Sequence, residues 1–85
     1  MKIMLTWSFE PGCYEAVVKR FLAGKEKIPK GMKLAGRWHA ASHGWALAET
    51  DDLLAVYRFT RQWQGMIRFV VKPVMDDAET AAVLK

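Results

Sequence analysis

The sequence contains a single cysteine, Cys13, and no long hydrophobic run. One cysteine excludes an intramolecular disulfide and a zinc site built from several cysteines, and it is typical of a reducing compartment. The apolar segment at residues 3–5 is too short for the central part of a signal peptide or for a membrane span. We therefore expect a cytoplasmic protein without membrane contact.

The motifs of common cofactor and catalytic sites are also missing. The chain has no phosphate-binding glycine loop, no nucleophile elbow and no pair of carboxylates with an evident catalytic role. His39 and His43 are four residues apart, but we place them on a strand and its turn, where this spacing does not put both rings on one face as it does in helical zinc motifs. We expect neither a metal nor a cofactor.

Apolar residues make up 52% of the chain and include four tryptophans, which supports a hydrophobic core and excludes an intrinsically disordered chain. The 85 residues fit one domain, residues 1–85. Domains this short bury only about 60–65% of the surface that their unfolded chains expose, so we expect self-association. The formal charge of +4 attracts anions, but much of it lies in a stretch that we interpret as a solvated loop, with Lys25, Lys27, Lys30 and Lys33.

Hydrophobic periodicity predicts the order of the elements. Alternation with a period of two marks four strands, at residues 2–7, 32–41, 45–49 and 66–74. Spacings of three and four residues mark two helices, at residues 14–22 and 53–63. Thr50 or Asp51 is expected to cap the second helix, and Asp76 or Asp77 to begin a short third helix.

The resulting order, βαββαβ with right-handed crossovers, predicts an α+β ferredoxin-like fold. Its antiparallel sheet has the spatial order 4-1-3-2 and carries both helices on one face. The alternation places Ile3, Leu5 and Trp7 under the helices, and the second helix faces them with Leu53, Val56, Tyr57, Thr60 and Trp63. The opposite face is left uncovered and is expected to show Met4, Thr6, Arg37, His39, Arg68, Val70 and Lys72.

Three stretches resemble an uncharacterised bacterial family, the domain of unknown function 3303: residues 2–7, residues 34–39 and residues 73–79. The Gly-Arg-Trp-His sequence at residues 36–39 is the most specific of these features, and the 14–22 helix and Trp63 also fit. The family is similar in layout to dimeric α/β-barrel proteins, which include cofactor-independent monooxygenases, haem-degrading enzymes and isomerases. The resemblance implies this fold and a homodimer, and it leaves the reaction open.

The uncovered face is the candidate site for a small anionic or aromatic ligand. Arg37 suits a carboxylate or an enolate, and His39 is the candidate acid–base catalyst, with Glu49 as its nearest carboxylate. The predicted ligand-binding residues are Arg37, His39, Met4, Thr6, Arg68, Trp38 and Trp45.

Other interpretations of the same residues stay open. Basic residues on the edge strands protect a sheet from unwanted pairing without any ligand. Another interpretation is a purely structural or adaptor dimer, in which the uncovered sheets pack together and the tryptophans stabilise the interface. The strand order also occurs in RNA-binding domains, but Met4 and Thr6 are not the aromatic residues on which those domains stack bases, so we expect no RNA or single-stranded DNA partner. Trp7 and Trp63 fall on predicted core positions.

Overall fold

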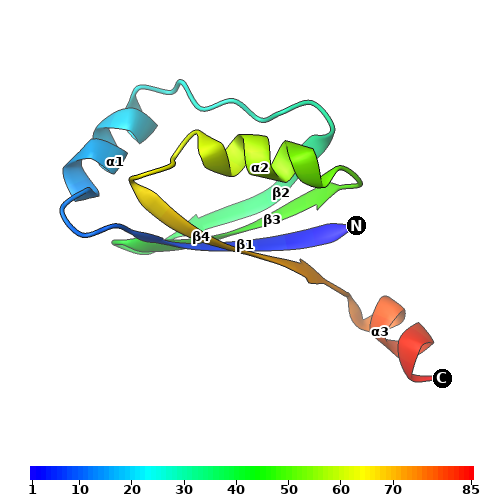
Figure 1. Ribbon diagram of the computed structural model, residues 1–85. Coiled ribbons are helices and arrows are strands. Elements are labelled where there is room, and N and C mark those ends of the chain that lie inside the picture. The colour runs from blue at the N-terminus through cyan, green and yellow to red at the C-terminus, as the bar shows by residue number, and fades with distance from the viewer.

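A four-stranded antiparallel sheet carries two helices on one face, while a third helix stands apart, as the computed structural model of residues 1–85 shows (Figure 1). The strand order is β2-β3-β1-β4, which confirms the predicted ferredoxin-like α+β fold. No helix has the length and apolar character to cross a membrane. The elements are β1 Lys2–Phe9, α1 Tyr14–Leu22, β2 Met32–His39, β3 His43–Thr50, α2 Leu53–Arg61, β4 Ile67–Val74 and α3 Asp77–Leu84.

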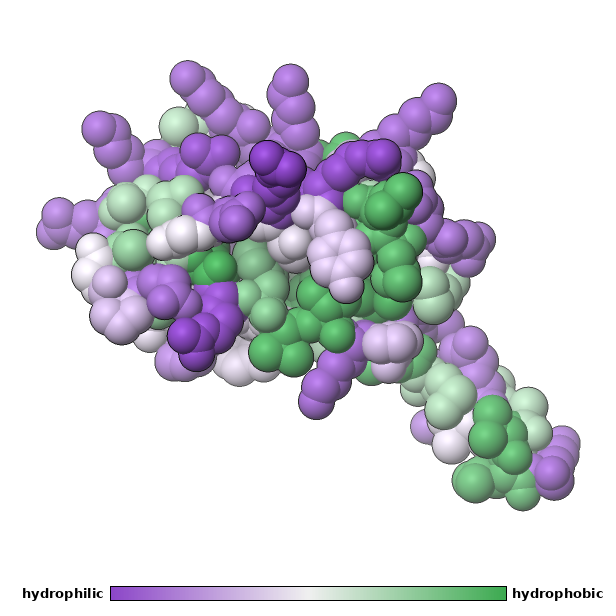
Figure 2. Space-filling model, in the orientation of Figure 1, coloured by the Kyte–Doolittle hydropathy of each residue, from purple (hydrophilic) through white to green (hydrophobic).

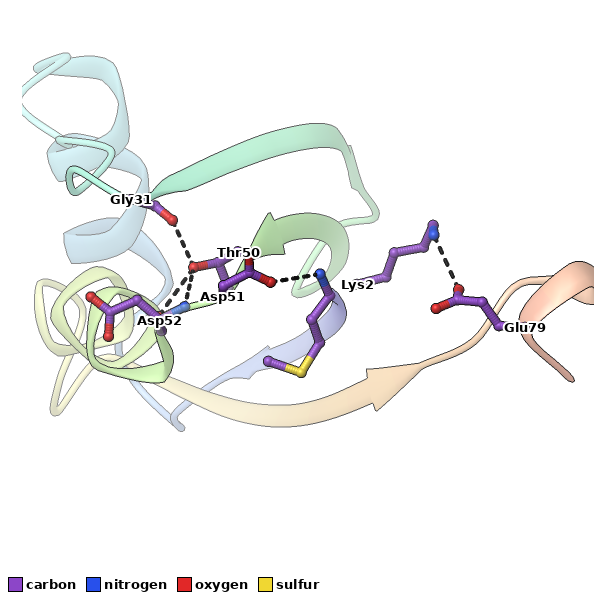
Figure 3. A network of polar contacts seen from close by, with 7 residues as sticks. Lys2, Gly31, Thr50, Asp51, Asp52 and Glu79 are labelled. Atoms are coloured by element: carbon purple, nitrogen blue, oxygen red, sulfur yellow. Dashed lines mark hydrogen bonds and ion pairs between the residues drawn. The ribbon is translucent and has the colours of Figure 1, made fainter. Parts of the chain in front are cut away.

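The residue that caps α2 is Asp52, not Thr50 or Asp51. Its backbone is extended, and its Oδ1 accepts a hydrogen bond from the amide of Leu54 at 3.0 Å. Thr50 is buried and joins two segments instead (Figure 3): its Oγ1 donates to the carbonyl of Gly31 at 2.7 Å and accepts from the amide of Asp52 at 2.9 Å. The loop before β2 is therefore tied to the start of α2.

The hydrophobic core lies between the sheet and α2. On β3 its members are alanines, whose short side chains let the helix come close to the strand. α2 buries Ala55, Val56 and Phe59, whereas Leu53 and Tyr57 of the predicted stripe are exposed. The core cluster consists of Ile3, Leu5, Trp7, Met32, Ala46, Ala48, Ala55, Val56 and Phe59.

A β-bulge reverses the predicted faces of β2 beyond Leu34. Leu34 pairs with Ala48 and Gly36 with Leu47, so Ala35 is an extra residue without a partner on β3. Beyond it, Arg37 pairs with Ala46 and therefore points to the helices. The prediction that Arg37 and His39 lie on the uncovered face is thus wrong, because one additional residue shifts the alternation of the strand by one place.

The face of the sheet opposite α1 and α2, which we call the open face, is formed by every second residue of each strand. Trp38 and Trp45 are cross-strand neighbours on it, with Thr6 beside Trp45 on β1. Arg68 and Val70 of β4 lie on the same face because they pair with Ser8 and Thr6. Met4, Thr6, Arg68, Trp45, Val70 and Lys72 are therefore on the open face, and Trp38, which the alternation placed toward the helices, joins them.

α3 extends away from the rest of the molecule beyond the end of β4 (Figure 1). None of its residues is buried, and its apolar side chains stand clear of the body (Figure 2). The radius of gyration is 14.2 Å, compared with about 12 Å expected for a compact chain of this length. Asp76 caps the helix in a capping box with Glu79, and Lys2 forms ion pairs with both carboxylates at 3.2 Å. These contacts fix where α3 leaves the sheet.

Acidification is expected to release this attachment. The amide of Glu79 and the ammonium group of Lys2 lower the pKa of Asp76 below its ordinary value of 3.8. Asp76 therefore stabilises the attachment fully above the ordinary value, and this contribution is lost as the pH falls through the lower pKa of the folded state. We expect the amide resonance of Glu79 to move toward its random-coil position between about pH 5 and pH 2 in an NMR titration.

The contribution of Lys2 to the attachment of α3 depends on pH in the opposite direction. The hydrogen bond to Glu79, together with Asp76, raises the pKa of Lys2 above 10.5, so its contribution is complete below that value and is lost as the pH rises through the higher pKa.

Asp76→Asn is the control for the acid titration, since it keeps an oxygen for the cap but removes the charge that titrates. An unmoved Glu79 resonance in acid would contradict the assignment.

Candidate functional site

A partly open cavity of about 40 Å³ lies between the sheet, α1 and α2. Three polar or charged side chains reach it: Glu26 from the loop between α1 and β2, and Arg37 and His39 from β2. Its other walls are apolar and mostly aromatic, formed by Trp7, Phe9, Val17, Phe21, Phe59, Trp63, Ile67 and Phe69.

The polar centre of this cavity is the carboxylate of Glu26, which accepts one hydrogen bond at each oxygen. Arg37 Nη1 donates to Oε1 at 2.6 Å, and Trp63 Nε1 donates to Oε2 at 2.9 Å. The side chains of Glu26 and Arg37 are only 13% and 25% exposed, so the ion pair is largely removed from water. Charge-assisted hydrogen bonds of this kind are short and strong. Removal of either partner would leave the other charge largely buried and unpaired, which is costly.

The loop that carries Glu26 is held to the turn after α2. The side-chain oxygen of Gln62 accepts from the amide of Lys27 at 3.0 Å, and its Nε2 donates to the carbonyl of the same residue at 2.7 Å. The Gln62 amide thus bonds to both the N–H and the C=O of Lys27, as a neighbouring strand would, and fixes the backbone next to Glu26. The loop is thus held at Lys27 as well as at Gly31, whereas the lysine-rich sequence predicted a solvated loop.

Phe21 lies at the junction of the cavity and the solvent. The guanidinium carbon of Arg37 is 5.5 Å from the centre of its ring, and the ring of His39 meets it edge-on at 5.3 Å. His39 also contacts Trp7 edge-on at 6.0 Å. Phe21 is exposed, although it lines the cavity. It therefore closes the cavity from the solvent side.

Glu49 is not the partner of His39. It lies on the open face, in register with Lys2 and Lys33, whereas His39 points toward the helices. His43 is also separated from His39, because it pairs with Ser8 and faces the opposite side. No group of three His, Cys, Asp or Glu side chains is arranged to hold a metal ion. The role of His39 in acid–base catalysis stays a prediction.

The predicted site residues are divided between the two faces. Arg37 and His39 line the cavity under the helices, whereas Thr6, Trp45 and Arg68 line a shallow hollow of about 200 Å³ on the open face. Met4 and Trp38 belong to neither. Arg68 is also engaged with Glu10, to which its Nε donates at 3.1 Å.

Sequence reasoning missed Glu26 and Phe21, and it assigned Trp63 to packing alone. Trp63 is buried as predicted, and its indole N–H also points at a carboxylate. The signal for Glu26 was weak: it is the one acidic residue in a stretch with four lysines. Such a residue is usually a solvated charge, and only the fold shows that it turns inward.

Comparison with known proteins gives a family and no activity. No curated protein and no solved structure matches the chain significantly. A family model described as a domain of unknown function, DUF3303, matches residues 1–85, and the chain therefore belongs to that family.

Proposed function

We propose that this domain binds a small aromatic molecule in the cavity between the sheet, α1 and α2. The observation that carries the proposal is the composition of the cavity, where aromatic walls surround three convergent polar side chains, Glu26, Arg37 and His39. Ligand sites are typically apolar cavities with a few polar groups that fix orientation. The hollow on the open face supports this less well, because it is shallow and more polar.

Binding requires the cavity to open. A volume of about 40 Å³ accommodates about three water molecules, whereas a cavity of about 150 Å³ holds benzene. α1 is the element most easily displaced, since Val17 is its only buried residue. A small outward movement of α1 takes Phe21 from the mouth and gives a ring access to Trp7 and Phe69.

While Glu26 is paired with Arg37, the charges at this site favour a neutral ligand. Arg37 is compensated by Glu26, so an added anion would meet both a cation and a carboxylate. A phenol-like molecule can place its ring among the aromatic residues and its hydroxyl beside the ion pair. This replaces the expectation of an anion bound at the open face.

Phenol is the probe that tests the proposal. We expect saturable quenching of tryptophan fluorescence, since Trp7 and Trp63 line the cavity, and a melting temperature that rises with phenol concentration. Val17→Phe fills the cavity and should weaken phenol binding by at least about tenfold, which is about 1.4 kcal/mol. Val18→Phe is the matched control on the same helix, because Val18 does not line the cavity. Equal affinity of both variants, or no saturable binding, would overturn the proposal.

We also propose that the open face is covered by a second copy of this chain. Trp38 and Trp45 are 59% and 44% exposed as neighbours on this face, which is unusual for a surface that stays in water. α3 is equally without a partner: beyond its first turn it is apolar on every side, and such helices are normally buried.

The two uncovered surfaces have opposite charge. The open face carries basic residues on its edge strands, including Lys33 and Lys72, whereas the first turn of α3 contains Asp77 and Glu79. An isolated helix of eight residues is marginal in water, so α3 gains stability from packing on another surface. Lys2 holds the start of α3 at the end of the sheet, and the helix extends from there away from the rest of the molecule (Figure 1). A homodimer lets each α3 reach the open face of the other copy.

A further inference from the structure

We infer that Glu26 occupies the place of a ligand's carboxylate, and that the cavity is built to receive an aromatic carboxylate of the size of benzoate. This inference rests on the proposed function, the binding of an aromatic molecule in the same cavity. It adds the chemical group that the polar centre recognises and assigns Glu26 the role of an internal competitor.

The receptor and its present occupant come from parts of the fold that differ in rigidity. The two donors belong to the framework: Arg37 lies on β2, paired with β3, and Trp63 is 3% exposed in the turn after α2. Together they supply one N–H to each oxygen of a single carboxylate. The carboxylate itself comes from an irregular loop, so the donors stay in place when the loop moves.

The same donors are arranged for a planar anion with a ring behind it. The apolar wall of the cavity begins directly beside the ion pair, where Phe21 lies within 5.5 Å of the Arg37 guanidinium. When Glu26 leaves, its carboxylate and two methylene groups add their volume to the 40 Å³ already present. A benzoate-like molecule then places its carboxylate between Arg37 and Trp63 and its ring among the aromatic side chains.

Glu26 competes with such a ligand because it is tethered. A group on a short loop acts at an effective concentration of the order of millimolar, which an external carboxylate must exceed. Apart from the contacts of Glu26 itself, side chains hold this loop at two backbone positions: Gln62 bonds to Lys27, and Thr50 Oγ1 donates to the carbonyl of Gly31. Lys25 and Lys27 flank Glu26 and attract anions to the place where it would be displaced. The native protein is therefore expected to bind benzoate weakly and a variant without the Glu26 carboxylate to bind it well.

The test is a titration of Glu26→Ala with benzoate and with its neutral isostere benzamide. Tryptophan fluorescence and the melting temperature are recorded for both ligands. We expect Glu26→Ala to melt below the native protein and to be restored by benzoate, with a Kd for benzoate at least about tenfold lower than that of the native protein. Benzamide should give no comparable gain. Glu26→Gln removes the charge and keeps one acceptor oxygen, but its NH2 group faces an N–H of Arg37 or Trp63. Its Kd should therefore fall between the other two, and it serves if Glu26→Ala does not fold.

A second variant separates recognition by Arg37 from a general effect of lost charge. In Glu26→Ala combined with Arg37→Met, the preference for benzoate over benzamide should disappear. Two results would overturn the inference. One is an equal Kd for benzoate in the native protein, Glu26→Ala and Glu26→Gln. The other is a preference for benzoate over benzamide that survives in the double variant. Phenol distinguishes this result from failure of the proposed function: saturable phenol binding without benzoate binding removes only the carboxylate assignment, whereas absence of both removes the cavity as a ligand site.

Discussion

Alanine in place of Gly44 is expected to destabilise the domain by about 2 kcal/mol, because a Cβ at this position would overlap the indole of Trp7. Trp7 is only 8% exposed and packs against the ring of Phe69, so it has no free space into which to move. A loss of this size lowers the melting temperature of a domain of this length by about 8–16 °C. Chemical denaturation at a fixed protein concentration measures the free energy directly.

Gly36→Ala is the matched control. An added Cβ at Gly36 also meets a tryptophan, Trp38, but that ring is 59% exposed in the single chain and can rotate into solvent at protein concentrations where the chain is monomeric. The expected loss is within about 0.5 kcal/mol, as for other surface substitutions. If both alanine variants lose the same stability, the close packing of Trp7 on Gly44 does not limit this site, and the explanation is wrong.

Glutamate in place of Trp45 should convert the proposed homodimer into a monomer. Trp45 lies on β3, one of the two central strands, so it is near the middle of the open face. Large aromatic side chains at interface centres carry much of the binding energy, and a buried unpaired carboxylate adds a penalty. We expect the dissociation constant to rise by at least about 100-fold, which is about 2.7 kcal/mol. Sedimentation velocity over a range of concentrations measures it.

Tyr57→Glu introduces the same charge on the outer side of α2, where Tyr57 is exposed. This variant should stay dimeric. Circular dichroism of Trp45→Glu should remain that of the native fold, since Trp45 contributes nothing to the core cluster. A native protein that is monomeric at micromolar concentration would rule out the dimer, and a dimer unaffected by Trp45→Glu would place its interface elsewhere.

Element order and strand order were predictable because each strand alternates over enough residues to define a buried side. β1 is the best case: Ile3, Leu5 and Trp7 are all buried. The buried face of α2 was less well defined, since its sequence opens with five apolar residues in succession, 53–57, which fit several faces of a helix. Packing against the alanines of β3 selects Ala55 and Val56 from this run.

The candidate site was harder to predict than the fold. Arg37 and His39 were identified from their chemistry, but their face depended on a bulge of one residue, to which only Gly36 within a strand pointed. Glu26 depended on the path of a loop, which no periodicity describes. The contact between them joins residues 11 positions apart whose meeting is decided by tertiary structure.

The bulge at Ala35 also bears on how the length of β2 can vary. In a strand, removing one residue normally transfers every later side chain to the other face, because side chains alternate between the two faces. Ala35 does not take part in the pairing with β3, because it has no partner on that strand. A protein lacking Ala35 would pair Leu34, Gly36 and Arg37 as consecutive residues and would keep Arg37 and His39 on the helix side and Trp38 on the open face. Position 35 is thus the point in β2 where a one-residue deletion preserves both faces.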